Sequence, residues 1–320
     1  MNALITGGAG FIGSHLAEAW LRRGGRVRVL DDLSLGQTSN LEMARALGPV
    51  ELVTGDVGDA RLLRRCLDDC EYVFHLAALP SVHRSIEAPL PSHTANLTAT
   101  VTLLDVCRVT PVSRLVFAGS SSVYGDQPVP AKHEALPPQP LSPYALQKYA
   151  AEQYGLLAAR HSGIPFVGTR FFNVFGPRQT FNSPYAGAIA RFCTGMLKGQ
   201  RPVIHGDGRQ SRDFTYVENI VDGLIRAALA PAGRVVGRVF NLACGEQVDL
   251  LRVVAELNRL TGQNLVPVFA PARPGDVRHS CADISAAREA LGYVPLVDWP
   301  EGLARTLEWY RACERTVPNQ

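Results

Sequence analysis

The chain has 320 residues, which suits two domains or one large one, and its hydrophobic share of 46% is enough for a buried core. With 32 basic and 29 acidic residues its net charge is +3. The chain is too hydrophobic and too weakly charged to be disordered, and it is not basic enough to suggest nucleic-acid binding. No apolar run approaches the roughly 18 residues that a membrane span needs. We therefore expect no membrane segment, and no signal peptide, because the first predicted strand begins at Asn2.

Seven cysteines are scattered along the chain without a C-x-x-C pair. This spacing argues against a disulfide framework and against a structural zinc site. We expect free, buried thiols, no metal, and a reducing, cytoplasmic location.

Strand-like and helix-like segments alternate through the first half of the chain. The predicted strands are Asn2–Thr6, Arg26–Asp31, Val50–Thr54, Tyr72–Leu76, Arg114–Ala118 and Phe166–Phe171. The predicted helices are Phe11–Arg23, Ala60–Leu67, Ser92–Arg108 and Pro143–His161. This alternation predicts βαβ units and a parallel sheet, and right-handed crossovers then give a doubly wound α/β fold of the Rossmann type.

The pattern changes after Phe171, where proline, glycine and aromatic residues become frequent. Helices are predicted at Tyr185–Lys198, Val217–Ala228, Leu250–Leu260 and Trp299–Arg315. We expect a smaller second α/β lobe made of residues 173–212 and 244–320. The first lobe comprises residues 1–172, joined by roughly 213–243, because the strand Val239–Ala243 is expected to return to the main sheet.

A glycine-rich turn, G-G-A-G-F-I-G at residues 7–13, directly follows the first strand and opens the first helix. In this context the glycines allow a tight turn and a close approach to a pyrophosphate, which the helix N-terminus attracts. The alternative is an ordinary glycine-rich turn. Asp31 ends the second strand, where a carboxylate accepts hydrogen bonds from the adenosine ribose and selects NAD over NADP.

Two further carboxylates each have two interpretations. Asp32 follows Asp31 and is either a cofactor contact or, as we favour, a carboxylate with a role only in the loop. Asp56 follows the third strand and either faces the adenine or caps the next helix.

Tyr144 and Lys148 are four residues apart on a helix that Ser142 and Pro143 begin, so they share one face. An ammonium group, together with an oxidised nicotinamide ring, would lower the pKa of the tyrosine from its ordinary value of about 10 and make it a general base. The alternative is a surface Tyr–Lys pair. Ser120 follows a predicted parallel strand, at the end where such folds bind ligands, and can hydrogen-bond a substrate hydroxyl.

As a set, these motifs resemble those of the extended short-chain dehydrogenase/reductases. They resemble most closely the UDP-hexose 4-epimerases, in the branch that acts on UDP-N-acetylglucosamine. The resemblance runs from Asn2 to about Arg311 and includes H-L-A-A at residues 75–78 and R-F-F-N-V-F-G-P-R-Q at residues 170–179. It implies bound NAD, a UDP-sugar substrate, and reversible epimerisation at carbon 4 through a 4-keto sugar.

The resemblance also implies roles for individual residues. The catalytic residues are Ser120, Tyr144 and Lys148. The candidate NAD-binding residues are Gly7, Gly10, Phe11, Ile12, Gly13, Asp31, Asp32, Asp56, Val57, Leu76, Ala77, Ala78, Asn96, Tyr144, Lys148 and Phe171. The candidate substrate-binding residues are Ser81, Ser120, Ser121, Ser122, Tyr144, Asn173, Gln179, Gly187, Arg212, Arg273, Asp276 and Ser280. For any single arginine among them, the alternative is a solvated surface charge.

Several of these positions bear on the identity of the reaction and of the sugar. The three serines at 120–122 stand where related dehydratases and decarboxylases have acidic residues, which argues against both reactions. Ser280 matches a position that limits pocket size, and a small residue there leaves space for an N-acetyl group. Pro80 departs from the glycine of close N-acetyl-preferring relatives, and for Pro80 and Gly187 a role in loop geometry alone is the alternative.

We therefore expect a UDP-GlcNAc/UDP-GalNAc 4-epimerase that also accepts UDP-Glc/UDP-Gal. The alternative within the class is a UDP-glucuronate 4-epimerase or another nucleotide-sugar short-chain enzyme, although many uronate enzymes have threonine where Asn173 stands. The alternative from another class is a catalytically silent NAD-binding regulatory protein, which the presence of Tyr144 and Lys148 disfavours. The resemblance further implies a homodimer formed by the helices Ser92–Arg108 and Pro143–His161.

Overall fold

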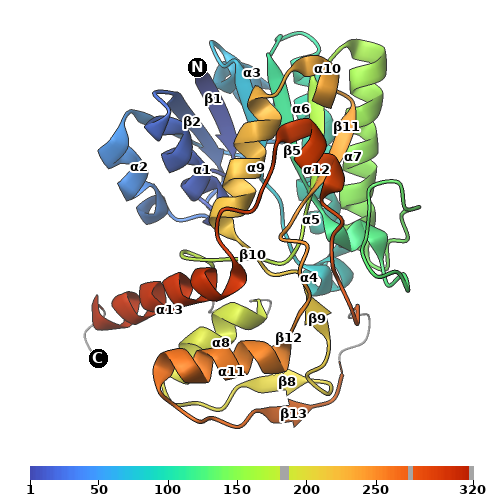
Figure 1. Ribbon diagram of the computed structural model, residues 1–320. Helices are drawn as coiled ribbons and strands as arrows, with labels where there is room; N and C mark the ends of the chain where they lie inside the picture. The colour runs from blue at the N-terminus through green and yellow to red at the C-terminus, as the bar shows by residue number, and fades with distance from the viewer. Residues whose placement is uncertain (181–186, 273–276, 317–320) are drawn as a thin grey trace.

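A computed structural model describes residues 1–180, 187–272 and 277–316 (Figure 1). Its centre is a seven-stranded parallel sheet with the strand order β11-β6-β5-β4-β1-β2-β3. The strands are β1 (Asn2–Thr6), β2 (Arg26–Asp31), β3 (Val50–Thr54), β4 (Tyr72–His75), β5 (Arg114–Ser120), β6 (Phe166–Phe171) and β11 (Arg238–Leu242). The predicted doubly wound α/β fold is confirmed, including the return of a late strand to the sheet.

Helices cover both faces of this sheet and create a core on each side. On one face lie α1 (Phe11–Arg22), α2 (Glu42–Leu47) and α9 (Val217–Leu229). On the other lie α3 (Ala60–Leu67), α6 (Ala99–Cys107) and α7 (Pro143–Ser162). The strand order reverses between β1 and β4, so a crevice is expected at their carboxyl ends, where doubly wound folds bind ligands.

The remaining elements gather mostly below the carboxyl ends of the strands (Figure 1). They include α8 (Ala188–Leu197), α11 (Leu250–Thr261) and α13 (Trp299–Thr316), with α8 in contact with both other helices. Three two-stranded sheets join β7 (Val174–Phe175) to β10 (Thr215–Tyr216), β8 (Val203–His205) to β13 (Val268–Ala270), and β9 (Ser211–Arg212) to β12 (Val248–Asp249). One late helix, α12 (Ser285–Leu291), packs instead against α9 and β11.

The predicted helix Ser92–Arg108 is interrupted. It consists of the end of α5 (Pro89–His93), a π-helical turn at Thr94–Thr98, and then α6. Sequence periodicity also missed short helices, among them α2, α4 (Val82–Glu87), α10 (Ala232–Val235) and α12. Helices this short give too few apolar repeats for a periodic pattern to be seen. Tyr185, the expected start of the helix that became α8, lies outside the described residues.

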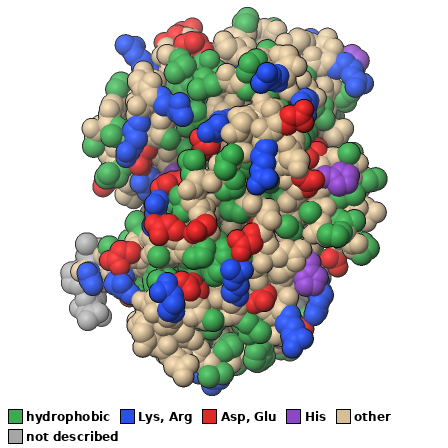
Figure 2. All heavy atoms as spheres, in the orientation of Figure 1, with side chains coloured by type: hydrophobic (Ala, Val, Ile, Leu, Met, Phe, Trp, Pro, Cys, Tyr) green, Lys and Arg blue, Asp and Glu red, His purple; other side chains and the backbone are tan. Residues whose placement is uncertain are grey.

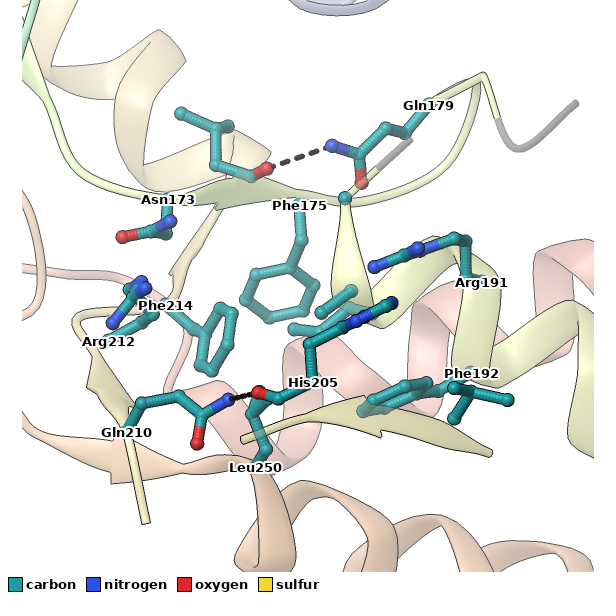
Figure 3. A pocket seen from close by; sticks show the side chains of 15 residues that line it. Asn173, Phe175, Gln179, Arg191, Phe192, His205, Gln210, Arg212, Phe214 and Leu250 are labelled. Atoms are coloured by element: carbon teal, nitrogen blue, oxygen red, sulfur yellow. Dashed lines mark hydrogen bonds between the residues drawn. The ribbon is translucent and has the colours of Figure 1, made fainter. Parts of the chain in front are cut away.

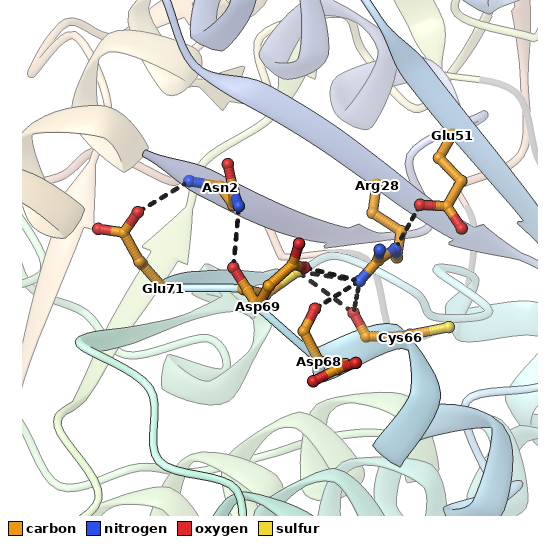
Figure 4. A network of polar contacts seen from close by, with 8 residues as sticks. Asn2, Arg28, Glu51, Cys66, Asp68, Asp69 and Glu71 are labelled. Atoms are coloured by element: carbon orange, nitrogen blue, oxygen red, sulfur yellow. Dashed lines mark hydrogen bonds and ion pairs between the residues drawn. The ribbon is translucent and has the colours of Figure 1, made fainter.

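Arg28 in β2 ties the end of α3 to the sheet (Figure 4). Its Nη1 donates hydrogen bonds to the carbonyl oxygens of Cys66 at 2.9 Å and Asp68 at 2.7 Å, and its Nε donates to the Glu51 carboxylate at 2.7 Å. The carbonyl groups at the end of a helix lack partners within the helix, so a guanidinium is a suitable cap.

The surface shows no concentration of one charge on the face drawn in Figure 2, where basic and acidic side chains are interspersed. Within the described ranges, no helix has the length and apolar character that crossing a membrane requires.

Candidate active site

The glycine turn leaves no room for a side chain at Gly7 or at Gly13. Gly7 has a φ of +70°, and a Cβ there would lie 2.7 Å from the backbone nitrogen of Ala77. A Cβ on Gly13 would lie 2.3 Å from the Gly7 carbonyl oxygen. The first hydrogen bond within α1 runs from Ser14 N–H to the carbonyl oxygen of the N-cap residue Gly10. This leaves three N–H groups at the positive end of the helix to receive an anion, those of Phe11, Ile12 and Gly13.

Asp31 lies beside this turn and is 6% exposed. Its carboxylate accepts hydrogen bonds from Ala9 N–H and Leu33 N–H, each at 2.9 Å. Burial raises the pKa of the Asp31 carboxyl, while these two hydrogen bonds oppose the rise. A carboxylate fixed next to a phosphate-binding turn can accept the ribose hydroxyls of a dinucleotide, so the turn and Asp31 together fit NAD.

The other two acidic candidates have local roles in the structure. Asp32 accepts hydrogen bonds from the N–H and the hydroxyl of Ser34, as the loop interpretation expects. Asp56 accepts a hydrogen bond from Gly58 N–H at 2.7 Å, and the cap of α3 is Asp59. The interpretation of Asp56 as the helix cap is therefore wrong, because Asp59 lies one residue before the helix. Val57, which follows Asp56, is 5% exposed and belongs to the core.

The loop that follows β4 contains Leu76, Ala77 and Ala78 and lies against the end of β1. Leu76 N–H donates to the Thr6 carbonyl oxygen at 3.1 Å, and Ala77 N–H to the Thr6 hydroxyl at 3.3 Å. Asn96 reaches this loop from the π-helical turn, and its Oδ1 accepts Leu79 N–H at 2.7 Å. The side chain of Asn96 thus contacts the loop backbone, and the glycine turn and the loop adjoin each other.

The three predicted catalytic residues come together where β5 ends. Lys148 is 3% exposed, and its Nζ donates to the Ala118 carbonyl oxygen at 2.9 Å. Ser120, the last residue of β5, shares a hydrogen bond of 2.8 Å with the hydroxyl of Ser122, which lies in the 3-10 turn that Ser121 begins. Phe171 ends β6 beside Ser120 in the sheet register. The predicted cap is also found, since Ser142 Oγ accepts Ala145 N–H at 3.2 Å.

The pKa values at this cluster differ in part from expectation. Burial raises the pKa of Tyr144 to about 12, against the effect of its hydrogen bond with Ser120. Burial also lowers the pKa of Lys148 to about 8. Burial thus outweighs the hydrogen bond with Ser120, and forming the Tyr144 phenolate requires positive charge beside its hydroxyl.

A cavity of about 210 Å³ lies among residues that follow β6 in the chain, beginning with Asn173 (Figure 3). Four predicted substrate-binding residues line it, namely Asn173, Gln179, Gly187 and Arg212. Arg212 and Phe214 approach it from one side, and Arg191 and His205 lie across from them (Figure 3). Asn173 lies two residues beyond Phe171, so the cavity begins close to the strand end that carries Ser120.

Sequence reasoning missed several lining residues, including Gln210, Phe214, Arg191 and His205. Three of the lining residues could have been predicted from their spacing. Gln210, Arg212 and Phe214 are two residues apart, and alternate residues of an extended segment lie on the same face. No comparable pattern marked Arg191 or His205.

The remaining candidates lie apart from the cavity wall. Ser280 is 7% exposed, and its N–H donates to the Ser211 carbonyl oxygen at 3.1 Å, so its segment borders the strand that carries Arg212. Ser81 caps α4, where its hydroxyl accepts Arg84 N–H at 3.1 Å. Arg273 and Asp276 lie outside the described residues. Across the parts of the chain that the structure describes, no group of three or more His, Cys, Asp or Glu side chains is placed to hold a metal.

Comparisons with known proteins agree with this geometry. Residues 3–243 match the NAD dependent epimerase/dehydratase family. The chain is 38% identical to UDP-glucose 4-epimerase of Mycolicibacterium smegmatis, over 97% of this chain and 99% of the relative. A solved UDP-N-acetylglucosamine 4-epimerase of Methanobrevibacter ruminantium, in complex with UDP-N-acetylmuramic acid, has a TM-score of 0.92 at 37% identity and covers 98% of both chains. UDP-glucuronic acid 4-epimerase of Bacillus cereus, with UDP-glucuronic acid and NAD, has a TM-score of 0.90 at 32% identity, over 98% of this chain and 100% of the other.

A glycine turn with a buried carboxylate next to it, together with a Ser–Tyr–Lys cluster, is typical of the short-chain dehydrogenase/reductases, and this chain belongs to the NAD dependent epimerase/dehydratase family. Within that family its activity is the NAD-dependent 4-epimerisation of a UDP-sugar.

Proposed function

We propose that the preferred substrates are UDP-GlcNAc and UDP-GalNAc, with UDP-Glc and UDP-Gal also accepted. The observation that carries this proposal is Gly187 in the cavity wall, because a residue without a side chain projects nothing into the cavity. Ser280 is a second small residue, on the segment that borders the cavity strand. The absent side chain of Gly187 leaves room for an acetamido group in the cavity, and the small Ser280 leaves room beside the strand that carries Arg212.

The proposed chemistry uses the cluster at the end of β5. Bound NAD supplies a hydride acceptor and donor for carbon 4 of the sugar. Tyr144 takes the proton of the 4-hydroxyl and returns it after the keto sugar has turned over, while the hydrogen bond between Ser120 and Tyr144 provides a path for that proton. Lys148 binds the nicotinamide ribose and adds positive charge next to Tyr144.

The proposed binding regions follow the two lobes. Residues 1–172 with 213–243 hold NAD through the glycine turn, Asp31, and the loop after β4. Residues 173–212 with 244–320 hold the UDP-sugar, and guanidinium groups such as that of Arg212 suit a diphosphate because they offer paired donors. The sugar then extends from the cavity toward Tyr144.

We also propose a homodimer formed through α7 and the segment 92–108, which holds the end of α5 and all of α6. Leu146, Tyr154 and Leu157 are 55%, 50% and 49% exposed and lie along one stripe of α7. Two copies packed against each other would bury that stripe. A monomer in light scattering at assay concentration would contradict it. Seven free cysteines, five of them buried, support the expected reducing, cytoplasmic location.

The substrate proposal is tested by comparing kcat/KM for UDP-GlcNAc, UDP-Glc and UDP-GlcUA. We expect the acetylated sugar to have the highest value. A Ser280→Tyr variant should lose UDP-GlcNAc turnover preferentially and keep UDP-Glc turnover. Equal losses on both sugars would contradict the size argument, and the highest value for UDP-GlcUA would favour the uronate alternative.

A further inference from the structure

Gln147 is the residue before Lys148 on α7, and it is 5% exposed. Its Oε1 accepts hydrogen bonds from Ser92 Oγ at 2.8 Å and from Asn96 Nδ2 at 2.9 Å. A buried amide on the helix that carries Tyr144 is thus bonded to the segment that leads from the loop after β4 into α6.

Asn96 continues this connection to the loop itself. Its Oδ1 accepts Leu79 N–H at 2.7 Å, and its Nδ2 lies 3.3 Å from the Leu79 carbonyl oxygen and 3.2 Å from Ser92 Oγ. Both polar atoms of the Asn96 amide are therefore engaged within the protein. Asn96 acts on the proposed cofactor site through the backbone of the loop at 76–79.

The backbone around Asn96 departs from a regular helix. Asn96 is the central residue of the π-helical turn Thr94–Thr98, which separates α5 from α6. Such single wide turns occur frequently at functional sites. A regular helix here would rotate Ser92 relative to the residues that follow the turn, and Ser92 and Asn96 would no longer meet Gln147 in the same way.

We propose that Gln147 is a positioning residue that, through Asn96, holds the catalytic helix in register with the loop at 76–79. This inference rests on the proposed roles of Tyr144 and Lys148. A second contact fixes the start of the same helix, since Tyr144 N–H donates to Ser85 Oγ of α4 at 3.0 Å. One hydrogen-bond network thus joins the loop at 76–79 to the helix that carries the proposed base, Tyr144. Small movements in this network change the distance between Tyr144 and the reacting carbon.

Two Gln147 variants separate positioning from packing. Gln147→Met keeps the length of the side chain and removes its acceptor oxygen. Gln147→Glu keeps oxygen acceptors for Ser92 and Asn96. Gln153→Met is the matched control, because Gln153 lies on the same helix and its amide donates to the carboxylate of its neighbour Glu152 at 3.4 Å.

The measurements are amide hydrogen exchange of the segment around Leu79 and the isotope effect on kcat with a UDP-sugar deuterated at carbon 4. For Gln147→Met we expect faster exchange at Leu79, a kcat about tenfold lower, a larger isotope effect, and an unchanged KM for the UDP-sugar. Gln147→Glu should recover most of the kcat, and Gln153→Met should match the wild type in every readout.

An unchanged isotope effect in Gln147→Met, with kcat lowered only in proportion to folded protein, would overturn the proposal. If Gln147→Met does not fold, Ser92→Ala decides: a larger isotope effect supports the proposal and an unchanged one overturns it. A Tyr144→Phe variant separates a failure of this inference from a failure of the proposed function. If Tyr144→Phe is inactive while the Gln147 result is negative, only this inference fails, whereas full turnover by Tyr144→Phe contradicts the proposed function.

Discussion

The ammonium group of Lys148 donates a hydrogen bond to the carbonyl oxygen of Ala118 at 2.9 Å, which joins α7 to the strand that ends in Ser120. The same ammonium group lies 5.0 Å from the centre of the Phe117 ring. The contact with β5 therefore holds Lys148 next to the strand that ends in Ser120. Because Tyr144 lies on the same helix as Lys148, this contact also positions Tyr144.

Replacing Lys148 should abolish most activity without unfolding the protein. Lys148→Met removes a buried charge, so the free energy of unfolding should not fall, whereas kcat should drop by about 10²-fold or more because the proposed role of Lys148 is to add positive charge next to Tyr144. The measurement is kcat per folded protein. Lys198→Met is the control, because the Lys198 side chain is 57% exposed, and its kcat should equal that of the wild type. Equal kcat values for the two variants would contradict the role of Lys148.

Acid should destabilise the fold through His75. This residue is 1% exposed and lies between the hydroxyls of Thr6 at 2.7 Å and Thr100 at 2.9 Å. Burial lowers the pKa of His75 to about 3. Below pH ~6.5 the unfolded chain binds a proton at this site and the folded chain does not, so stability is lost as the pH falls, at about 1.4 kcal/mol per pH unit.

A His75→Gln variant should therefore show a shallower fall of the melting temperature between pH 6.5 and 4 than the wild type. Burial likewise lowers the pKa of His15 to about 4, so part of the acid sensitivity remains in the variant. His161→Gln, at an exposed position, should follow the wild type. Parallel curves for all three proteins would show that His75 does not contribute.

Asp213 should act on substrate binding because it holds three segments together. It is fully buried between the cavity residues Arg212 and Phe214, and its carboxylate accepts N–H bonds from Cys244, Gly245 and Ala282 at 2.9, 2.9 and 3.1 Å. Asp213→Ala leaves these groups without an acceptor and should cost about 3 kcal/mol of stability.

Among folded Asp213→Ala molecules, we expect a raised KM for the UDP-sugar and an unchanged affinity for NADH, measured by fluorescence titration. Asp105→Ala removes an exposed carboxylate and serves as the control. An unchanged KM would show that Asp213 supports the fold without setting the position of Arg212.

The Arg28 contacts should contribute to stability and not to catalysis. Arg28→Met removes the cap from the end of α3 and should lower the free energy of unfolding by about 1–3 kcal/mol. Arg108→Met breaks only an exposed ion pair and should cost less than about 1 kcal/mol. Chemical denaturation measures both, and kcat per folded molecule should stay unchanged. A similar cost for the two variants would contradict the capping role of Arg28.

Much of the fold and of the catalytic cluster could be predicted from the sequence because local rules governed it. The glycine turn, the strand ends at Asp31 and Ser120, and the four-residue spacing of Tyr144 and Lys148 are short-range patterns, and the structure has the predicted turn, strand ends and helix at these residues. The parallel sheet follows from the alternation of apolar strands and helices.

The rest depends on contacts between distant segments. The π-helical turn at Asn96 is stabilised by Gln147 and Leu79, which no local pattern connects to it. Asp56 and Asp59 both precede α3, and only the backbone geometry selects Asp59 as its cap. His205 and Arg191 reach the cavity from β8 and α8 through the packing of these elements, and no local pattern marks which of their side chains face it.

The most direct test of the account is a proton NMR time course of the purified protein with UDP-GlcNAc, UDP-Glc and UDP-GlcUA in separate samples, without added NAD. The account predicts that the carbon-4 epimer of at least one sugar appears, that UDP-GalNAc forms fastest, and that Tyr144→Phe forms none. The absence of an epimer from all three sugars would contradict it.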